Sequence, residues 1–136
     1  MTYKVAVNTE AAYEYVNKFF PVVRVADQKG IVQYRNDEVV AAALYVEFNG
    51  SNVFVHLAGS PDKRWLTRDF LYWGFHYPFV QLGCRRITCC VDVTNVTSRI
   101  FCEHIGWKPE AVLEAAGVGG VDVIVYKMFR EDCKYV

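Results

Sequence analysis

The sequence predicts an α/β protein in which a mixed sheet carries helices on both faces. Apolar and β-branched residues alternate in several short segments, of which 87–93 is the clearest, and such alternation is typical of strands. Longer segments, such as 10–20, carry apolar residues at helical spacing. A run of hairpin-linked strands followed by a strand–helix–strand unit requires both antiparallel and parallel pairing in one sheet.

The expected elements follow one another as strand, helix, three strands, helix, strand, helix and two strands. Their ranges are 3–7, 10–20, 31–34, 39–48, 52–58, 67–82, 87–93, 95–105, 112–116 and 121–129. The first helix begins at Asn8 or Thr9 and ends before Pro21, because proline disfavours the helical conformation in the residue that precedes it. Asn49-Gly50 is the strongest hairpin signal in the chain, so the strands on either side of it are expected to pair.

The second helix, over 67–82, is almost wholly apolar and aromatic, so we expect it to be buried on more than one side. Thr67 can cap its beginning. Pro78 lies inside it and has no N–H to donate to the carbonyl of Gly74, which predicts a kink or a weakened turn.

The segment from Thr88 to Trp107 is the most informative part of the chain. Its strand places Ile87, Cys89 and Val91 on one face of the sheet, with Thr88, Cys90 and Asp92 on the other face. Asn95 is a good N-cap for the helix that follows, and Gly106 stands where helices commonly end in a left-handed residue.

Composition limits the classes of protein that fit. The chain has 136 residues, so we expect one domain over 1–136, and 53% of its residues are hydrophobic, which argues against disorder. A formal net charge of zero argues against a nucleic-acid partner, which needs a basic face. No apolar run is long enough to span a bilayer and the N-terminus lacks a signal-peptide core, so we expect a cytoplasmic protein with no membrane association.

The cysteines and histidines do not form a metal site in the sequence. The five cysteines include no C-x-x-C pair, and an odd number of them without a secretion signal indicates reduced thiols. The three histidines are scattered rather than clustered at ligand spacing, so no metal is expected. Cys89 is expected to be a small, buried and unreactive core residue.

The spacing of Asn95, Ser98, Gly106 and Trp107 resembles the N-x-x-[AS]…G-[FW] segment of the GNAT acyltransferases. The element order is similar to that of the GNAT fold over nearly the whole chain, with the second of the two usual N-terminal helices missing or reduced to 21–27. The phrases FHYPFVQLGCRRIT, EHIGW and VDVIVYKM are most similar to RimJ/RimL-like and phage-encoded members.

This resemblance implies an acetyl-CoA-dependent N-acetyltransferase that acts on a primary amine of a protein N-terminus, a lysine or a small molecule, as a monomer or homodimer. It also implies a pyrophosphate-binding turn over 60–68, where neither glycine of the family's Q/R-x-x-G-x-G/A loop is present. Lys63, Arg64 and Arg68 supply cations there. The expected acetyl-CoA-binding residues are His56, Leu57, Ala58, Lys63, Arg64, Trp65, Leu66, Thr67, Arg68, Asn95 and Ser98.

The catalytic groups are less well marked than the binding residues. The family's usual proton donor is a tyrosine seven residues after the helix asparagine, and Cys102 stands at that position. A thiol could donate a proton, although a CoA thiolate is itself a tolerable leaving group. Glu47 and His56 lie on the two strands beside the expected cleft and are candidate bases, as is Asp92. Ser98 completes the catalytic candidates.

A second hypothesis belongs to another functional class. The chain could be a catalytically inactive GNAT-fold protein, of phage origin, that binds CoA or serves as an interaction module. The absent loop glycines, the absent tyrosine and the absence of an obvious base favour this alternative. The spacing of Asn95 and Ser98 and the basic turn favour the enzyme.

Overall fold

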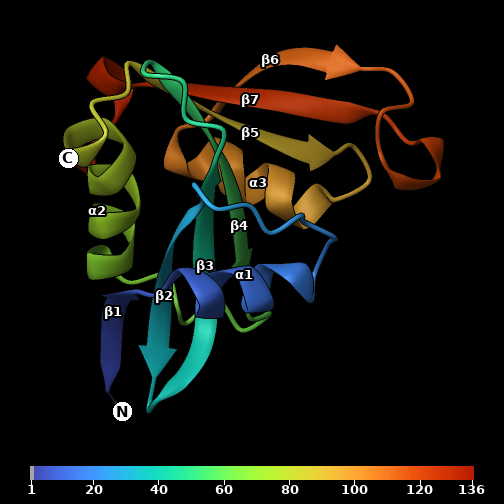
Figure 1. Ribbon diagram of the computed structural model, residues 1–136. Coiled ribbons are helices and arrows are strands. Elements are labelled where there is room, and N and C mark those ends of the chain that lie inside the picture. Colours follow the sequence, from blue (N-terminus) through green and yellow to red (C-terminus); the bar gives the residue numbers. More distant parts are fainter. Residues whose placement is uncertain (1) are drawn as a thin grey trace.

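The computed structural model describes residues 2–136 as a seven-stranded mixed sheet with the strand order β1-β2-β3-β4-β5-β7-β6 (Figure 1). The strands are β1 (Tyr3–Val7), β2 (Lys29–Arg35), β3 (Glu38–Val46), β4 (Asn52–Gly59), β5 (Arg86–Asp92), β6 (Lys108–Leu113) and β7 (Val123–Phe129). The helices are α1 (Thr9–Asn17), α2 (Arg68–His76) and α3 (Val96–Ile105), with short turns η1 (Tyr77–Gln81), η2 (Val118–Gly120) and η3 (Arg130–Asp132). The predicted order of elements is confirmed.

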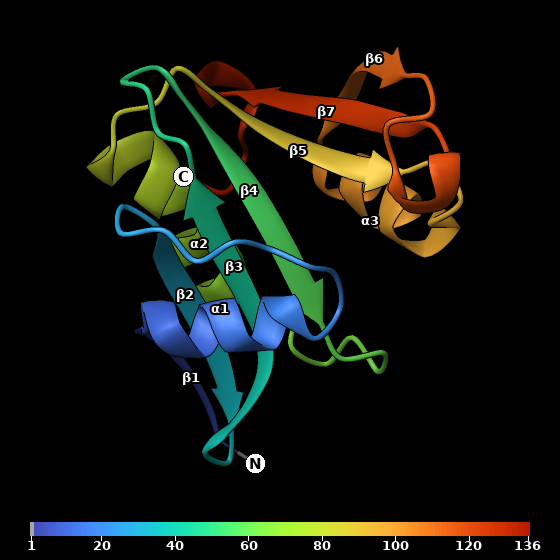
Figure 2. The same ribbon diagram turned by 45° about the vertical axis from the view of Figure 1, so that its right-hand side comes forward.

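The sheet divides into two parts that meet at β4 and β5. Strands β1 to β4 form an antiparallel meander, and β5, β7 and β6 form a second antiparallel group. Strand β4 joins β5 in parallel, as the expected strand–helix–strand crossover requires. Figure 2 shows these two central strands spreading apart from their common end.

Helices cover both faces of the sheet, as predicted. Helix α1 packs on β2, β3 and β4 around a set of small and branched residues that includes Ala12 and Ala42. The approach is close, since a Cβ on Gly30 would lie 2.3 Å from the Cβ of Ala12. Helices α2 and α3 lie with a larger core on the opposite face. The connection over 21–27 contains no helix, so the second N-terminal helix of the GNAT pattern is absent here.

The predicted starts of the three helices and the predicted end of α3 are confirmed, whereas α1 ends at Asn17, three residues earlier than predicted. The side chains of Asn8, Thr67 and Asn95 cap α1, α2 and α3, each accepting a hydrogen bond from the backbone N–H three residues later. Gly106 ends α3 with a φ of 111°, a conformation that costs glycine little because it has no Cβ.

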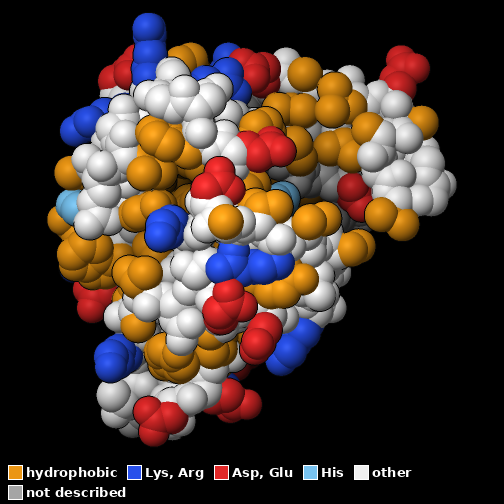
Figure 3. Space-filling view, in the orientation of Figure 1, with side chains coloured by type: hydrophobic (Ala, Val, Ile, Leu, Met, Phe, Trp, Pro, Cys, Tyr) orange, Lys and Arg blue, Asp and Glu red, His pale blue; other side chains and the backbone are white. Residues whose placement is uncertain are grey.

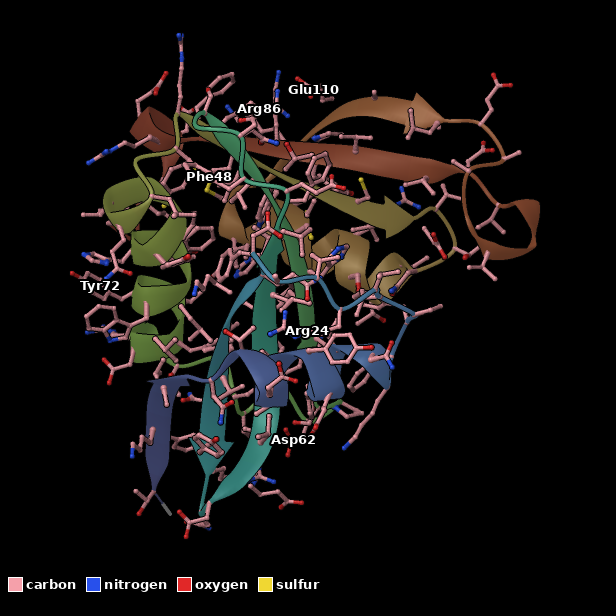
Figure 4. The ribbon with its side chains drawn as sticks, in the orientation of Figure 1. Arg24, Phe48, Asp62, Tyr72, Arg86 and Glu110 are labelled. Carbon is pink, nitrogen blue, oxygen red and sulfur yellow. The ribbon has the colours of Figure 1, made fainter. Side chains whose placement is uncertain are left out.

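The second helix differs from the prediction in its length and its burial. α2 ends at His76 and continues as a π-helical turn, in which the N–H of Leu82 bonds to the carbonyl of Tyr77 at 2.9 Å. This wider turn surrounds Pro78, so the expected irregularity is confirmed there. The expected burial on several sides is wrong, because Tyr72 and Trp73 are each 41% exposed. Tyr72 points away from the sheet, and hydrophobic side chains gather on this surface (Figures 3 and 4).

The strand expected over 112–116 is also displaced in the structure. β6 occupies Lys108–Leu113, and Ala115 has a φ of 54°, which an extended strand does not permit. The strand is an exposed edge with a register shift after Pro109, so it has no buried face whose alternation could mark its start. The salt bridge of Arg86 to Glu110, 2.8 Å long, attaches it to β5 (Figure 4).

Candidate active site

A cleft opens where β4 and β5 separate. The two strands pair only over Asn52–Phe54 and Arg86–Thr88. Beyond that point β4 still pairs with β3 and β5 with β7, so the two edges that face each other carry backbone N–H and C=O groups with no strand partner. The cavity between them has a volume of about 400 Å³ and is lined mostly by apolar side chains. It is the size of a small-molecule site.

The cleft has two sides because successive strand residues point to opposite faces of the sheet. Leu57 and Cys89 face the core beneath α2 and α3, and Ser98 and Phe101 of α3 line the cleft on that side. Ile87, Cys89 and Val91, predicted to share one face of β5, all belong to this core. We call this the helix α3 side of the cleft.

The other side of the cleft is formed by His56, Cys90 and Asp92, which alternate with those inward residues along β4 and β5. Phe20, from the connection after α1, packs on His56 with ring centroids 5.6 Å apart. Val118, from the turn between β6 and β7, also lines the cleft. We call this the helix α1 side of the cleft.

The structure places the residues predicted from the sequence in two groups. Those that line the cleft are His56, Leu57, Trp65, Leu66, Asn95, Ser98 and Cys102. Those that do not line it are Glu47, Ala58, Lys63, Arg64, Thr67 and Arg68. Ala58 is packed beneath α1, and Thr67 is engaged as the cap of α2. The three cations are exposed, with Lys63 and Arg64 on the connection from β4 to α2 and Arg68 at the first position of α2.

That connection is a folded turn rather than a glycine-rich loop. The carboxylate of Asp62 accepts hydrogen bonds from the hydroxyl of Ser60 and the backbone of Arg64, and it forms a 3.0 Å ion pair with Arg35. These partners hold the pKa of Asp62 below its usual value, with the Ser60 hydrogen bond as the largest cause. Lys63 takes a φ of 58° at the corner of this turn.

Trp65 fills the space at the end of this turn. Its indole N–H donates to the carbonyl of Ser60 at 2.8 Å, and its ring packs edge-on against Phe70. It also lies so close to Gly59 that a Cβ there would be 2.1 Å from an indole carbon. The same ring packs on Phe101 of α3 with ring centroids 5.7 Å apart, so the β4–α2 connection and α3 meet through aromatic side chains.

Asn95 and Ser98 lie where the family spacing predicts a ligand contact. The side-chain oxygen of Asn95 accepts the backbone N–H of Ser98 at 3.2 Å, and both residues line the cleft. The hydroxyl of Ser98 has no hydrogen-bond partner within residues 2–136. It is therefore available to a ligand, while Asn95 serves the helix and the cleft together.

Two thiols, those of Cys89 and Cys102, lie together in an apolar setting on the helix α3 side. Cys102 lines the cleft and hydrogen-bonds Cys89, and this contact together with burial raises the pKa of the Cys89 thiol. Tyr45 is the one tyrosine that lines the cleft within residues 2–136, and its hydroxyl donates to the carbonyl of Gly74 at 2.6 Å. Its proton is therefore already engaged.

His56 is the titratable nitrogen base of the cleft. Burial lowers its pKa from the ordinary value, and the charge of nearby Glu47 opposes that shift in part. A lowered pKa keeps the imidazole neutral at physiological pH, which is the form that accepts a proton. Glu47 follows β3 with a φ of 58° and acts on His56 by charge alone.

Several cleft residues were not identified from the sequence. Phe20 and Val118 lie in connections without regular structure, and no local pattern brings them to β4. Phe101 carried a usable signal, because it follows Ser98 by three residues and so shares its helix face. Among residues 2–136 no group of three metal-ligating side chains comes together, and no helix is long and apolar enough to cross a membrane.

Comparison with known proteins identifies the fold. No protein-family model matches the chain, and no curated protein sequence matches it. A mutant form of the spermidine/spermine N-acetyltransferase SpeG from Vibrio cholerae superposes with a TM-score of 0.77 at 11% identity, covering 96% of each chain. A dodecameric intermediate-state structure of the spermidine N-acetyltransferase from the same organism gives 0.76 at 14% identity, covering 95% of this chain and 94% of that one. The chain therefore has the GNAT acyltransferase fold.

Proposed function

We propose that the protein is an acetyl-CoA-dependent N-acetyltransferase. The observation that carries the proposal is the pair of unpartnered strand edges on β4 and β5, which enclose an apolar cleft of about 400 Å³. An extended ligand with amide groups can hydrogen-bond such an edge as an added strand, and the pantetheine arm of acetyl-CoA has that character. The structural neighbours share this fold and are N-acetyltransferases, which supports the proposal.

Three cations close in sequence to the cleft-lining residues Trp65 and Leu66 fit the charged end of acetyl-CoA. Lys63, Arg64 and Arg68 are exposed and take part in none of the ion pairs found in residues 2–136. Their charges are therefore free to pair with phosphate groups. On the helix α3 side, Asn95 and Ser98 would contact the pantetheine arm near the sulfur.

The reaction we propose is direct transfer. The acceptor nitrogen forms a bond to the thioester carbonyl carbon, the bond from that carbon to sulfur breaks, and CoA leaves as the thiolate. Neutral His56 takes the proton that the amine loses, and a backbone N–H of β4 near Leu57 would stabilise the charge that develops on the carbonyl oxygen. Cys102 lines the cleft and is hydrogen-bonded to Cys89, and the CoA thiolate can leave without a proton donor.

A second function is favoured by two specific observations. No tyrosine hydroxyl is free in the described part of the cleft, and the first turn of α2 carries the acidic Asp69 where the phosphates would bind. A carboxylate at a helix N-terminus competes with another anion for the same N–H groups. A protein with these features could bind CoA, or a protein partner, without performing catalysis.

The test combines binding with turnover. Acetyl-CoA at a hundredfold excess over its dissociation constant should stabilise the native state by about 2.7 kcal/mol, which thermal denaturation measures. Ser98→Phe should remove that shift by filling the cleft, and Thr97→Phe, on the exposed neighbouring position of α3, should keep it. Free thiol should then appear when a suitable amine is added. No shift at millimolar acetyl-CoA would contradict both functions that involve CoA.

A further inference from the structure

Within residues 2–136, the helix α1 side of the cleft contains a single carboxylate, that of Asp92. The residue lies at the end of β5 and lines the cleft, and its carboxylate makes no hydrogen bond or ion pair within residues 2–136. Asp92 is half-buried, so water can reach its carboxylate in the free protein. An unpaired carboxylate in an apolar cleft is a site for one cationic group.

Among residues 2–136 no other carboxylate lines the cleft, although the charge of Glu47 reaches His56. Glu10 of α1 is held by Arg24 of the following connection at 2.6 Å, and Arg24 lies against α1 in Figure 4. Glu47 does not line the cleft. The other side chains that line it are neutral or apolar, apart from His56, whose lowered pKa keeps it neutral.

Apolar, partly exposed side chains line the same cleft as Asp92. Phe19 is 50% exposed and Val118 is 80% exposed, and both line the cleft together with Phe20 and Pro21. Large apolar side chains in this setting gain stability when a ligand removes their surface from water. The site therefore offers one anchor for an ammonium group and an apolar surface for the rest of the molecule.

We infer that the acceptor is a small primary monoamine with an apolar alkyl or aryl body, held through its ammonium by Asp92 and through its body by Phe19, Phe20 and Val118. This inference rests on the proposed N-acetyltransferase activity. A polyamine carries several ammonium groups, and each would need a carboxylate or water in place of these apolar walls. The single negative charge of this site therefore matches a monoamine better than spermidine, the polyamine after which the structural neighbours are named.

The backbone of the β6–β7 connection lies close to Asp92. A Cβ on Gly117 would lie 2.9 Å from a carboxylate oxygen of Asp92, so the backbone of the β6–β7 connection approaches that group closely. Val118 follows Gly117 directly in the chain, so its apolar side chain lies near the carboxylate of Asp92. The β6–β7 connection thus brings together the carboxylate of Asp92 and the apolar side chain of Val118, which would both contact the amine.

The experiment compares hexylamine, phenethylamine and spermidine as acceptors at one fixed pH, with acetyl-CoA and a free-thiol assay. The expected kcat/KM is at least about tenfold higher for the two monoamines than for spermidine. The further ammonium groups of spermidine would be buried without an anionic partner, which is strongly disfavoured. Asp92→Asn, which preserves size, should raise the KM for hexylamine about tenfold and leave the acetyl-CoA melting shift unchanged.

A gain-of-function variant gives the inference a second test. Val118→Glu introduces another carboxylate at an exposed position of the cleft and should raise the kcat/KM of spermidine relative to hexylamine. Val112→Glu, on the exposed strand β6 outside the cleft, should leave the ratio unchanged.

The outcomes separate this inference from the proposed function. Equal or faster turnover of spermidine, or acetylation of a peptide N-terminus with no turnover of hexylamine, would overturn the inference and keep the acetyltransferase. No melting shift with acetyl-CoA, or a shift with no thiol release from any amine, would overturn the proposed activity itself.

Discussion

Phe20 packs on His56 with ring centroids 5.6 Å apart, and this contact brings the connection after α1 onto the edge of β4. The contact removes water from one face of the imidazole. It thereby contributes to the burial that lowers the pKa of His56. A neighbouring aromatic ring thus helps to keep this side chain neutral and able to accept a proton.

His56→Gln should change the shape of the pH profile. We expect neutral His56 to remove the proton from a bound ammonium group. In that case kcat/KM rises with pH up to the pKa of His56, which burial lowers below the ordinary value of about 6.5. Above this pKa, kcat/KM stays level up to the pKa of the amine. Without His56 the rate should follow the free amine and rise tenfold per pH unit across that range. An unchanged profile would remove His56 from the catalytic role.

Glu47→Gln provides a directional control for the same measurement. The charge of Glu47 raises the pKa of His56 against the effect of burial, so its removal should shift the limb of the profile to lower pH. Glu47 does not line the cleft, so kcat on the level part should stay within about twofold of the original. A fall in kcat without movement of the limb would show that Glu47 itself takes the proton.

The fold of this chain is well determined by local signals where a segment has one buried face. The strand over 87–93 and its helix were predicted almost to the residue, because alternation, the cap at Asn95 and the stop at Gly106 agree. β6 was misplaced because an exposed edge strand has no buried face. The exposure of Tyr72 on α2 could not be predicted, since an aromatic side chain has the same sequence signal whether it contacts the core or solvent.

The site was only partly predictable for a different reason. The residues on β4 and α3 follow from the family spacing and from strand alternation, and these place His56, Asn95 and Ser98 in the cleft. Phe20 and Val118 reach the cleft from irregular connections, whose paths are set by tertiary packing rather than by local sequence.

Trp65→Ala should weaken the fold and the cleft together. The indole is 6% exposed, donates a hydrogen bond to Ser60 and contacts Phe101, so its loss should lower the free energy of unfolding by about 3–5 kcal/mol. Trp73→Ala, on the exposed face of α2, should cost less than half as much. Urea denaturation of both variants measures the difference, and equal losses would show that Trp65 is not a central packing residue.

Cys102→Ala should have little effect on turnover. Cys102 occupies the position of the family's proton donor, but its hydrogen bond joins it to Cys89 and a CoA thiolate can leave unassisted. We expect kcat to fall by less than about threefold, because general acid catalysis of this step would otherwise contribute a factor of about a hundred or more. Single-turnover kinetics at fixed pH measures it. A hundredfold loss would assign the proton-donating role to Cys102.

We propose that acetyl-CoA binds between the free edges of β4 and β5. Amide hydrogen exchange measures this directly, because an added strand protects N–H groups that are otherwise open to solvent. With saturating acetyl-CoA, exchange should slow in residues 55–59 of β4 and 89–92 of β5, while the edge strand β6 stays unchanged. Unchanged exchange in both edges of the cleft, under conditions where acetyl-CoA is bound, would contradict the account.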